Sequence, residues 1–154
     1  MTTLQDELRQ RKPFGSAAQE AFLSLVRTET ALRAGLEQVL GPHGLSLAQY
    51  NVLRILRGAG REGVCRNDIR DRLVSRMPDV SRLLDRMEAA GLVRRVRSTE
   101  DRRQVTTTLT PRGRALVDQL DPLVAAEHQR RLGHLSERQL RTLIDLLAQI
   151  RAQA

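Results

Sequence analysis

Apolar residues recur every three or four positions along most of the chain, and this spacing predicts a mainly α-helical protein. The first long helix is expected over residues 14–40, where Gly41-Pro42 supplies a stop signal. The stretch Ser46-Leu47-Ala48-Gln49 is a capping box, in which the serine and glutamine side chains satisfy backbone N–H groups at the start of the next helix. We expect that helix to end near Arg57, before a glycine-containing break.

Two shorter helices and a β-hairpin are predicted in the middle of the chain. The helices are expected over residues 66–74 and 78–90, and Gly91 then supplies the left-handed conformation that commonly ends a helix. The segments 92–97 and 105–110 are rich in β-formers and flank a polar loop, which is typical of a hairpin. The buried stripe of the second helix is expected to consist of Val80, Leu83, Leu84 and Met87.

The C-terminal part of the chain predicts two further helices. Thr110 can cap the first, with Pro111 in its opening turn, and residues 136–139 form a second capping box. The apolar stripes over residues 22–40 and 140–150 are longer than a small lobe can bury, so we expect them to pack against a second copy of the chain. The predicted fold class is mainly α with a small β-hairpin.

Length and composition suit one domain of 154 residues. No stretch has the roughly 18 uninterrupted apolar residues of a transmembrane helix, and the N-terminus lacks the apolar centre of a secretory signal. We therefore expect a soluble cytoplasmic protein with no membrane partner. The single cysteine, Cys65, cannot form an internal disulfide, which agrees with a reducing compartment.

Positive charge is concentrated in the predicted short helices and the hairpin. The formal net charge is +8, and residues 66–114 contain thirteen arginines against seven acids. Such an excess indicates a polyanionic partner, with a solvated basic face as the alternative. A short helix, a turn, a second helix and a basic hairpin form a winged helix-turn-helix, whose second helix enters the major groove of DNA. An arginine at the hairpin loop then gains from the negative potential of the minor groove.

Several motifs in and beside this region point to one family. They are Gly44-Leu45-Ser46 with Gln49-Tyr50 and Leu53, then Arg82-Leu83-Leu84-Asp85-Arg86-Met87-Glu88, Gly91-Leu92-Val93-Arg94-Arg95, Asp101-Arg102-Arg103 and Leu109-Thr110-Pro111-Arg112-Gly113. Together they resemble the multiple antibiotic resistance regulator (MarR) family. The resemblance implies one domain over residues 1–154, with a winged-helix lobe over 45–114. Residues 1–44 and 115–154 would then form a helical dimerisation region from both termini.

The resemblance also implies which residues contact double-stranded DNA. Arg103 matches the wing arginine, which Asp101 orients, and Ser81 and Arg82 match base-facing positions. Asp79 departs from the small hydroxyl residues usual there; it could accept from a cytosine amino group or cap the helix N-terminus, and capping is favoured. The full expected set is Ser46, Arg66, Asn67, Arg76, Met77, Pro78, Asp79, Ser81, Arg82, Arg86, Arg95, Arg97, Asp101, Arg102 and Arg103.

The function that the resemblance implies is sequence-specific transcriptional regulation. We expect a homodimer that represses from a pseudo-palindromic operator and is released by a small anionic or phenolic effector. The effector is expected between the lobe and the dimer helices, near His43, Tyr50 and Arg54. One alternative is a nonspecific architectural nucleic-acid-binding protein, whose binding depends on salt but not on sequence. A second is a protein-interaction module that has lost DNA binding.

No pattern of an enzyme, a metal site or a cofactor site is found in the sequence. His43, His128 and His134 lack the spacing of zinc ligands, and there is no nucleophile elbow, phosphate-binding loop or Rossmann glycine set. Cys65 precedes the third predicted helix, whereas the peroxide-sensing branch of the family carries its cysteine in the first. We therefore expect Cys65 to be an inert thiol.

Overall fold

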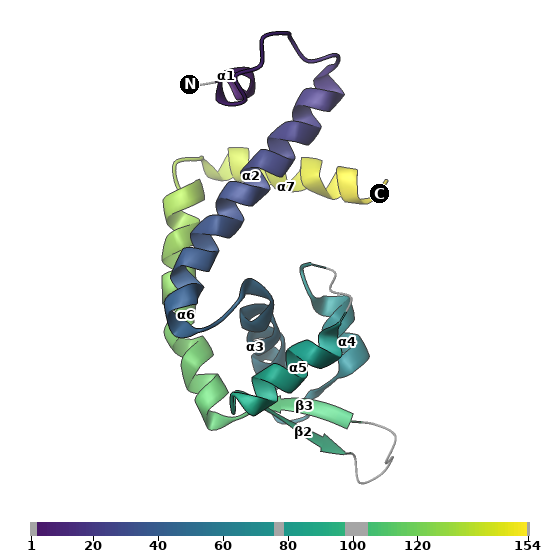
Figure 1. Cartoon of the computed structure of the whole chain (residues 1–154), viewed down its shortest axis with the longest axis vertical. Coiled ribbons are helices and arrows are strands. Elements are labelled where there is room, and N and C mark those ends of the chain that lie inside the picture. Colours follow the sequence, from purple (N-terminus) through teal and green to yellow (C-terminus); the bar gives the residue numbers. More distant parts are fainter. Residues whose placement is uncertain (1–2, 76–78, 98–104, 154) are drawn as a thin grey trace.

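The computed structural model describes residues 3–75, 79–97 and 105–153 (Figure 1). Its helices are α1 (Leu4–Glu7), α2 (Ala17–Leu40), α3 (Leu47–Ala59), α4 (Arg66–Arg72), α5 (Val80–Ala89), α6 (Pro111–Leu132) and α7 (Glu137–Arg151), with a 3-10 turn, η1 (Gly41–His43), after α2. The strands are β1 (Val64–Cys65), β2 (Val93–Arg97) and β3 (Val105–Leu109). The prediction of a mainly α protein with a small β-hairpin is confirmed.

Figure 1 shows two parts of the molecule. One part, here called the lobe, contains α3, α4, α5 and the three strands. The other, here called the arm, contains α2, α6 and α7. Helices α2 and α6 pack against each other and lead away from the lobe, and α7 follows α6 at the far end. None of the helices in the described ranges is both long enough and apolar enough to cross a bilayer.

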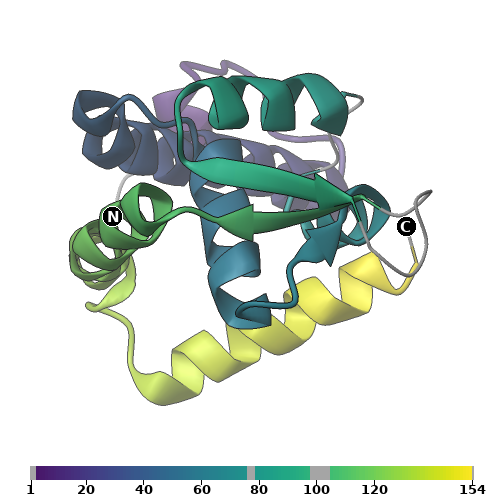
Figure 2. The ribbon, with the colours of Figure 1, turned by 90° about the horizontal axis from the view of Figure 1, so that it is seen from below.

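The strands form an antiparallel sheet in the order β1-β3-β2. Val93 pairs with Leu109 at the base of the predicted hairpin, and Arg97 pairs with Val105 toward its loop. Strand β1 was not predicted, because two residues leave no alternating pattern to detect; it joins the sheet by pairing Val64 with Thr107. Figure 2 shows α5 running beside the hairpin of β2 and β3, so that these elements share one end of the lobe.

The hydrophobic core lies where the lobe meets the near ends of α2 and α6. The predicted stripe of α5 is buried as expected, and side chains of the arm complete the core. Its most completely buried aliphatic residues are Leu40, Val52, Leu53, Leu56, Ile69, Leu83, Leu84, Met87, Val93, Val117 and Leu120. Helix α7, in contrast, has no buried residue in the single protomer.

Several helix boundaries differ from the prediction, and local capping explains the differences. Helix α2 begins at Ala17 rather than at residue 14, because the Ser16 hydroxyl accepts from the Gln19 N–H and takes the cap position. Helix α5 begins at Val80 rather than at residue 78, because Asp79 caps it. The capping boxes predicted at Ser46 and Ser136 are both present.

Candidate functional site

Helix α5 has one buried face and one exposed face. Val80 and Leu84 lie on the buried face, whereas Ser81, Arg82 and Arg86 lie away from the core. The Arg82 side chain is 84% exposed, and its Nε lies 2.9 Å from Asp79 Oδ2. This ion pair uses the Nε group and leaves the guanidinium's other N–H donors, of which two suffice to read a guanine edge.

Asp79 acts as the N-cap of α5. Its Oδ1 accepts from the Arg82 backbone N–H at 2.9 Å, while Oδ2 pairs with the Arg82 side chain at 2.9 Å. The capping role favoured from the sequence is therefore confirmed. Because both carboxylate oxygens have partners, Asp79 orients Arg82 in addition to starting the helix.

The start of α4 lies beside the start of α5. Arg66 Nη1 donates to Ser81 Oγ at 3.2 Å, which joins two predicted DNA contacts, and Asn67 next to it is exposed. Ser46, also predicted to contact DNA, lies instead at the start of α3. Its hydroxyl caps that helix by accepting from the Gln49 N–H at 3.2 Å. The predicted contacts at Arg66 and Ser81 therefore lie together, next to Arg82 in α5.

The two described arginines of the wing predicted to contact DNA differ in their surroundings. Arg95 Nη2 lies 2.7 Å from Asp85 Oδ1 and 2.6 Å from Glu88 Oε2, and its backbone N–H donates to Glu88 Oε1 at 2.9 Å. These hydrogen bonds, the backbone one first, hold the pKa of Glu88 below its usual range. Arg95 thus links β2 to α5, whereas Arg97, at the end of β2, is exposed.

Six predicted DNA contacts lie outside the described residues, and they stay predictions. They are Arg76, Met77, Pro78, Asp101, Arg102 and Arg103.

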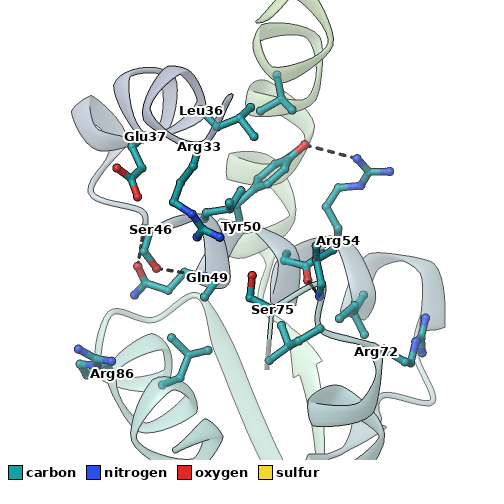
Figure 3. A pocket seen from close by; sticks show the side chains of 18 of the residues that line it. Arg33, Leu36, Glu37, Ser46, Gln49, Tyr50, Arg54, Arg72, Ser75 and Arg86 are labelled. Atoms are coloured by element: carbon teal, nitrogen blue, oxygen red, sulfur yellow. Dashed lines mark hydrogen bonds between the residues drawn. The ribbon is translucent and has the colours of Figure 1, made fainter. Parts of the chain in front are cut away.

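A cavity of about 950 Å³ lies between the lobe and the arm (Figure 3). Of the three residues predicted to line it, Tyr50 and Arg54 do so. His43, which lies in the 3-10 turn η1, does not line the cavity. The charged and titratable lining residues that were not predicted for the cavity are Arg33, Glu37, Arg72, Arg86 and His128. Of these, Arg86 was predicted to contact DNA instead. Among the described lining residues, cationic side chains therefore outnumber the one carboxylate, that of Glu37, and apolar residues such as Leu36 and Val124 complete the lining.

A group of polar side chains joins α3 of the lobe to α6 of the arm. The Tyr50 hydroxyl donates to Asp121 Oδ1 at 2.7 Å, Arg57 Nη2 donates to Asp121 Oδ2, and Arg54 Nε lies 3.8 Å from Oδ1. Arg57 Nη1 also donates to Asp118 Oδ1 at 2.9 Å. We call Tyr50, Arg54, Arg57 and Asp121 the Asp121 cluster.

Ionisation within the Asp121 cluster follows from these contacts. Burial raises the pKa of Asp121, but the hydrogen bonds from Tyr50 and Arg57, together with the nearby guanidinium charges, outweigh it and hold that pKa below its usual range. Burial, and then the hydrogen bond to Asp121, raise the pKa of Tyr50. Near neutral pH, therefore, a charged carboxylate accepts from a neutral phenol and a guanidinium.

Comparison with known proteins identifies the family. A sequence profile described as MarR family matches residues 43–104. A crystal structure of a MarR transcription factor from Planctomyces limnophilus is 42% identical with a TM-score of 0.68, and the match covers 88% of this chain and 98% of that one. This chain belongs to the MarR family. As a family member it is a DNA-binding transcriptional regulator and not an enzyme.

Two further relatives extend the comparison for this MarR family member. The transcriptional regulator TtmR of Methylorubrum extorquens (strain PA1) is 38% identical over 113 residues, which cover 73% of this chain and 56% of TtmR. The chain thus spans a little over half the length of that relative. The structure of Bordetella bronchiseptica BpsR, whose DNA binding is regulated by 6-hydroxynicotinic acid, is 28% identical with a TM-score of 0.78. That match covers 91% of this chain and 98% of BpsR.

Proposed function

We propose that two copies of the chain form a homodimer that recognises a pseudo-palindromic operator and represses transcription. Residues 45–114 read the DNA, and residues 1–44 and 115–154 form the dimer. The observation that carries the proposal is the exposed face of α5, where Arg82 is held by the cap residue Asp79 beside Ser81. Repression follows because a dimer on an operator that overlaps a promoter excludes polymerase.

Uncovered apolar side chains on the arm support the dimer. In the single protomer Phe22 is 65% exposed on α2, and Ile144, Leu146 and Ile150 are 51–52% exposed on α7. Full burial of one such side chain stabilises by about 1.5–3 kcal/mol, so several together favour association. Light scattering at micromolar concentration should give the mass of a dimer, and a monodisperse monomer would refute this part of the proposal.

Arg82 provides the test of sequence reading. Selection of bound DNA from a random pool supplies the operator, and a scrambled duplex of equal length supplies the comparison. Arg82→Ala should weaken operator binding by about 1–3 kcal/mol and relax the preference at one base pair in each half-site, with a much smaller loss on the scrambled duplex. Arg27→Ala is the matched control, because Arg27 is also exposed and paired with one acid, Glu7, but lies on α2.

The nonspecific alternative predicts a different result. If the protein were an architectural binder, wild type would bind operator and scrambled duplex equally, with the same steep loss of affinity at high salt. Equal losses on both duplexes for Arg82→Ala would make Arg82 a phosphate contact only.

Arg103, outside the described residues, is proposed as the wing arginine, and Arg103→Ala should weaken binding to every duplex and flatten its salt dependence.

We also propose that a small anionic or phenolic effector binds the cavity and releases the DNA. The support is the cavity's position between lobe and arm, its excess of cationic side chains, and the similar case of BpsR. Such a ligand shifts the dimer only by its differential affinity for two lobe arrangements. The test is to add 6-hydroxynicotinic acid to the operator complex of wild type and Arg72→Ala. We expect the compound to release operator DNA from wild type at a lower concentration than from Arg72→Ala. If neither protein releases DNA, this compound is not the effector.

A further inference from the structure

The Asp121 cluster connects lobe and arm through polar side chains of α3 and α6. Tyr50, Arg54 and Arg57 lie four and three residues apart on α3, so they share one face of that helix. All three turn to one carboxylate on α6. Tyr50 is 5% exposed, and the Asp121 side chain is 27% exposed, so these contacts are only partly screened by water.

Packing of side-chain ridges into grooves sets the class of angle between α3 and α6, but angles within one class scatter by about 15–20°. The hydrophobic effect is non-directional, so buried core residues of these helices, such as Leu53 on α3 and Leu120 on α6, do not by themselves select one angle within that range. Hydrogen bonds weaken steeply when their angles change. The 2.7 Å bond from Tyr50 and the ion pair from Arg57 therefore supply the directional constraint.

We propose that Asp121 is a positioning residue that fixes the lobe on the arm and thereby sets the spacing of operator half-sites that the dimer accepts. This inference rests on the proposed function, because a lobe angle acts on DNA only when two lobes are joined. Each lobe carries its own α5, the helix proposed to enter the major groove, and the two copies of α5 must meet grooves about 34–36 Å apart. A lobe that rotates freely on its arm tolerates other spacings.

The same carboxylate connects the lobe angle to the cavity. Tyr50 and Arg54 line the cavity, and both also contact Asp121; Arg54 Nη1 lies 3.5 Å from the Tyr50 hydroxyl (Figure 3). An anion in the cavity that pairs with Arg54 removes one cation from Asp121. Cavity occupancy and lobe angle are therefore coupled through one group, without any contact between the ligand and DNA.

The test measures spacing preference rather than affinity alone. Wild type, Asp121→Asn and Asp118→Asn are titrated against the selected operator and against operators with one or two base pairs inserted between the half-sites. Asparagine keeps the size of the side chain but loses the charge that pairs with Arg57. Asp118→Asn is the matched control, because Asp118 also pairs with Arg57 but has no bond to Tyr50.

The expected result is a change in the ratio of affinities. For Asp121→Asn, the preference for the native spacing should fall at least about fivefold, the lower range of allosteric coupling. For Asp118→Asn the ratio should stay within about twofold of wild type, since exposed ion pairs contribute little. Tyr50→Phe, which removes only the hydroxyl, should reduce the ratio in the same direction and serves if Asp121→Asn fails to fold.

The outcomes separate this inference from the proposed function. If wild type shows no preference among the spacings, the proposal that a dimer binds two half-sites is wrong, and the inference about Asp121 fails with it. A wild type that prefers one spacing, together with Asp121→Asn and Tyr50→Phe variants that keep the wild-type ratio, overturns the role of Asp121 alone. A fall in melting temperature with an unchanged ratio likewise shows that Asp121 only stabilises the fold.

Discussion

Gly113 lies where the helical arm leaves the base of the wing, and its replacement by alanine tests the packing there. A Cβ at Gly113 would lie 2.0 Å from the Leu92 carbonyl oxygen, whereas real Cβ contacts essentially never fall below 3.0 Å. The neighbour is backbone and cannot swing aside. The same oxygen accepts from the Thr110 N–H at 3.1 Å. It also shares the Thr110 hydroxyl proton with the Gly91 oxygen, at 3.1 and 2.7 Å respectively, so moving it weakens both contacts.

The magnitude follows from opposing contributions. Forced overpacking costs about 1–3 kcal/mol, and weakening the two bonds to Leu92 adds up to about 1 kcal/mol each. Alanine in place of glycine within a helix returns about 1 kcal/mol. We therefore expect Gly113→Ala to lower the free energy of unfolding by about 2 kcal/mol and the melting temperature by about 4–8 °C.

Gly58→Ala is the matched control for this prediction. Gly58 lies in α3, and a Cβ there meets no atom within 4 Å, so only the helix propensity acts and stability should rise by up to about 1 kcal/mol. Both variants are melted by circular dichroism at one protomer concentration, because the melting of the proposed dimer would depend on concentration. A Gly113→Ala variant as stable as wild type would refute the packing argument.

Three further outcomes follow from the described contacts. The stabilisation that Asp121 gives, measured against Asp121→Asn, should be complete above its unfolded pKa near 3.8 and disappear as pH falls through its lower folded pKa, as acid titration of unfolding would show. Arg95→Ala should lower the melting temperature by breaking its bonds to α5, whereas Arg97→Ala should spare stability and reduce the salt dependence of DNA binding. Cys65→Ser should bind operator like wild type with and without peroxide, and release by peroxide of wild type alone would contradict this.

Much of the fold follows from signals that are local in the sequence. The Ser46 capping box, Thr110 with Pro111 at the start of α6, and Gly91 with φ +68° at the end of α5 each act within a few residues. Such chemistry depends little on the remainder of the chain. The sequence alone therefore sufficed for most of the helices, for the hairpin and for the exposed face around Arg82.

Other features depend on which elements the tertiary structure brings together. Strand β1 exists because Val64 meets Thr107, and two residues carry no periodic pattern of their own. His128 lines the cavity, and His43 does not, because the packing of α6 on the lobe decides which histidine faces it. A signal for the Asp121 cluster was present in the i, i+4, i+7 spacing on α3. That spacing could not reveal a site, however, because the carboxylate that these residues share comes from a helix more than sixty residues away. Only the packing of the arm on the lobe brings it to them.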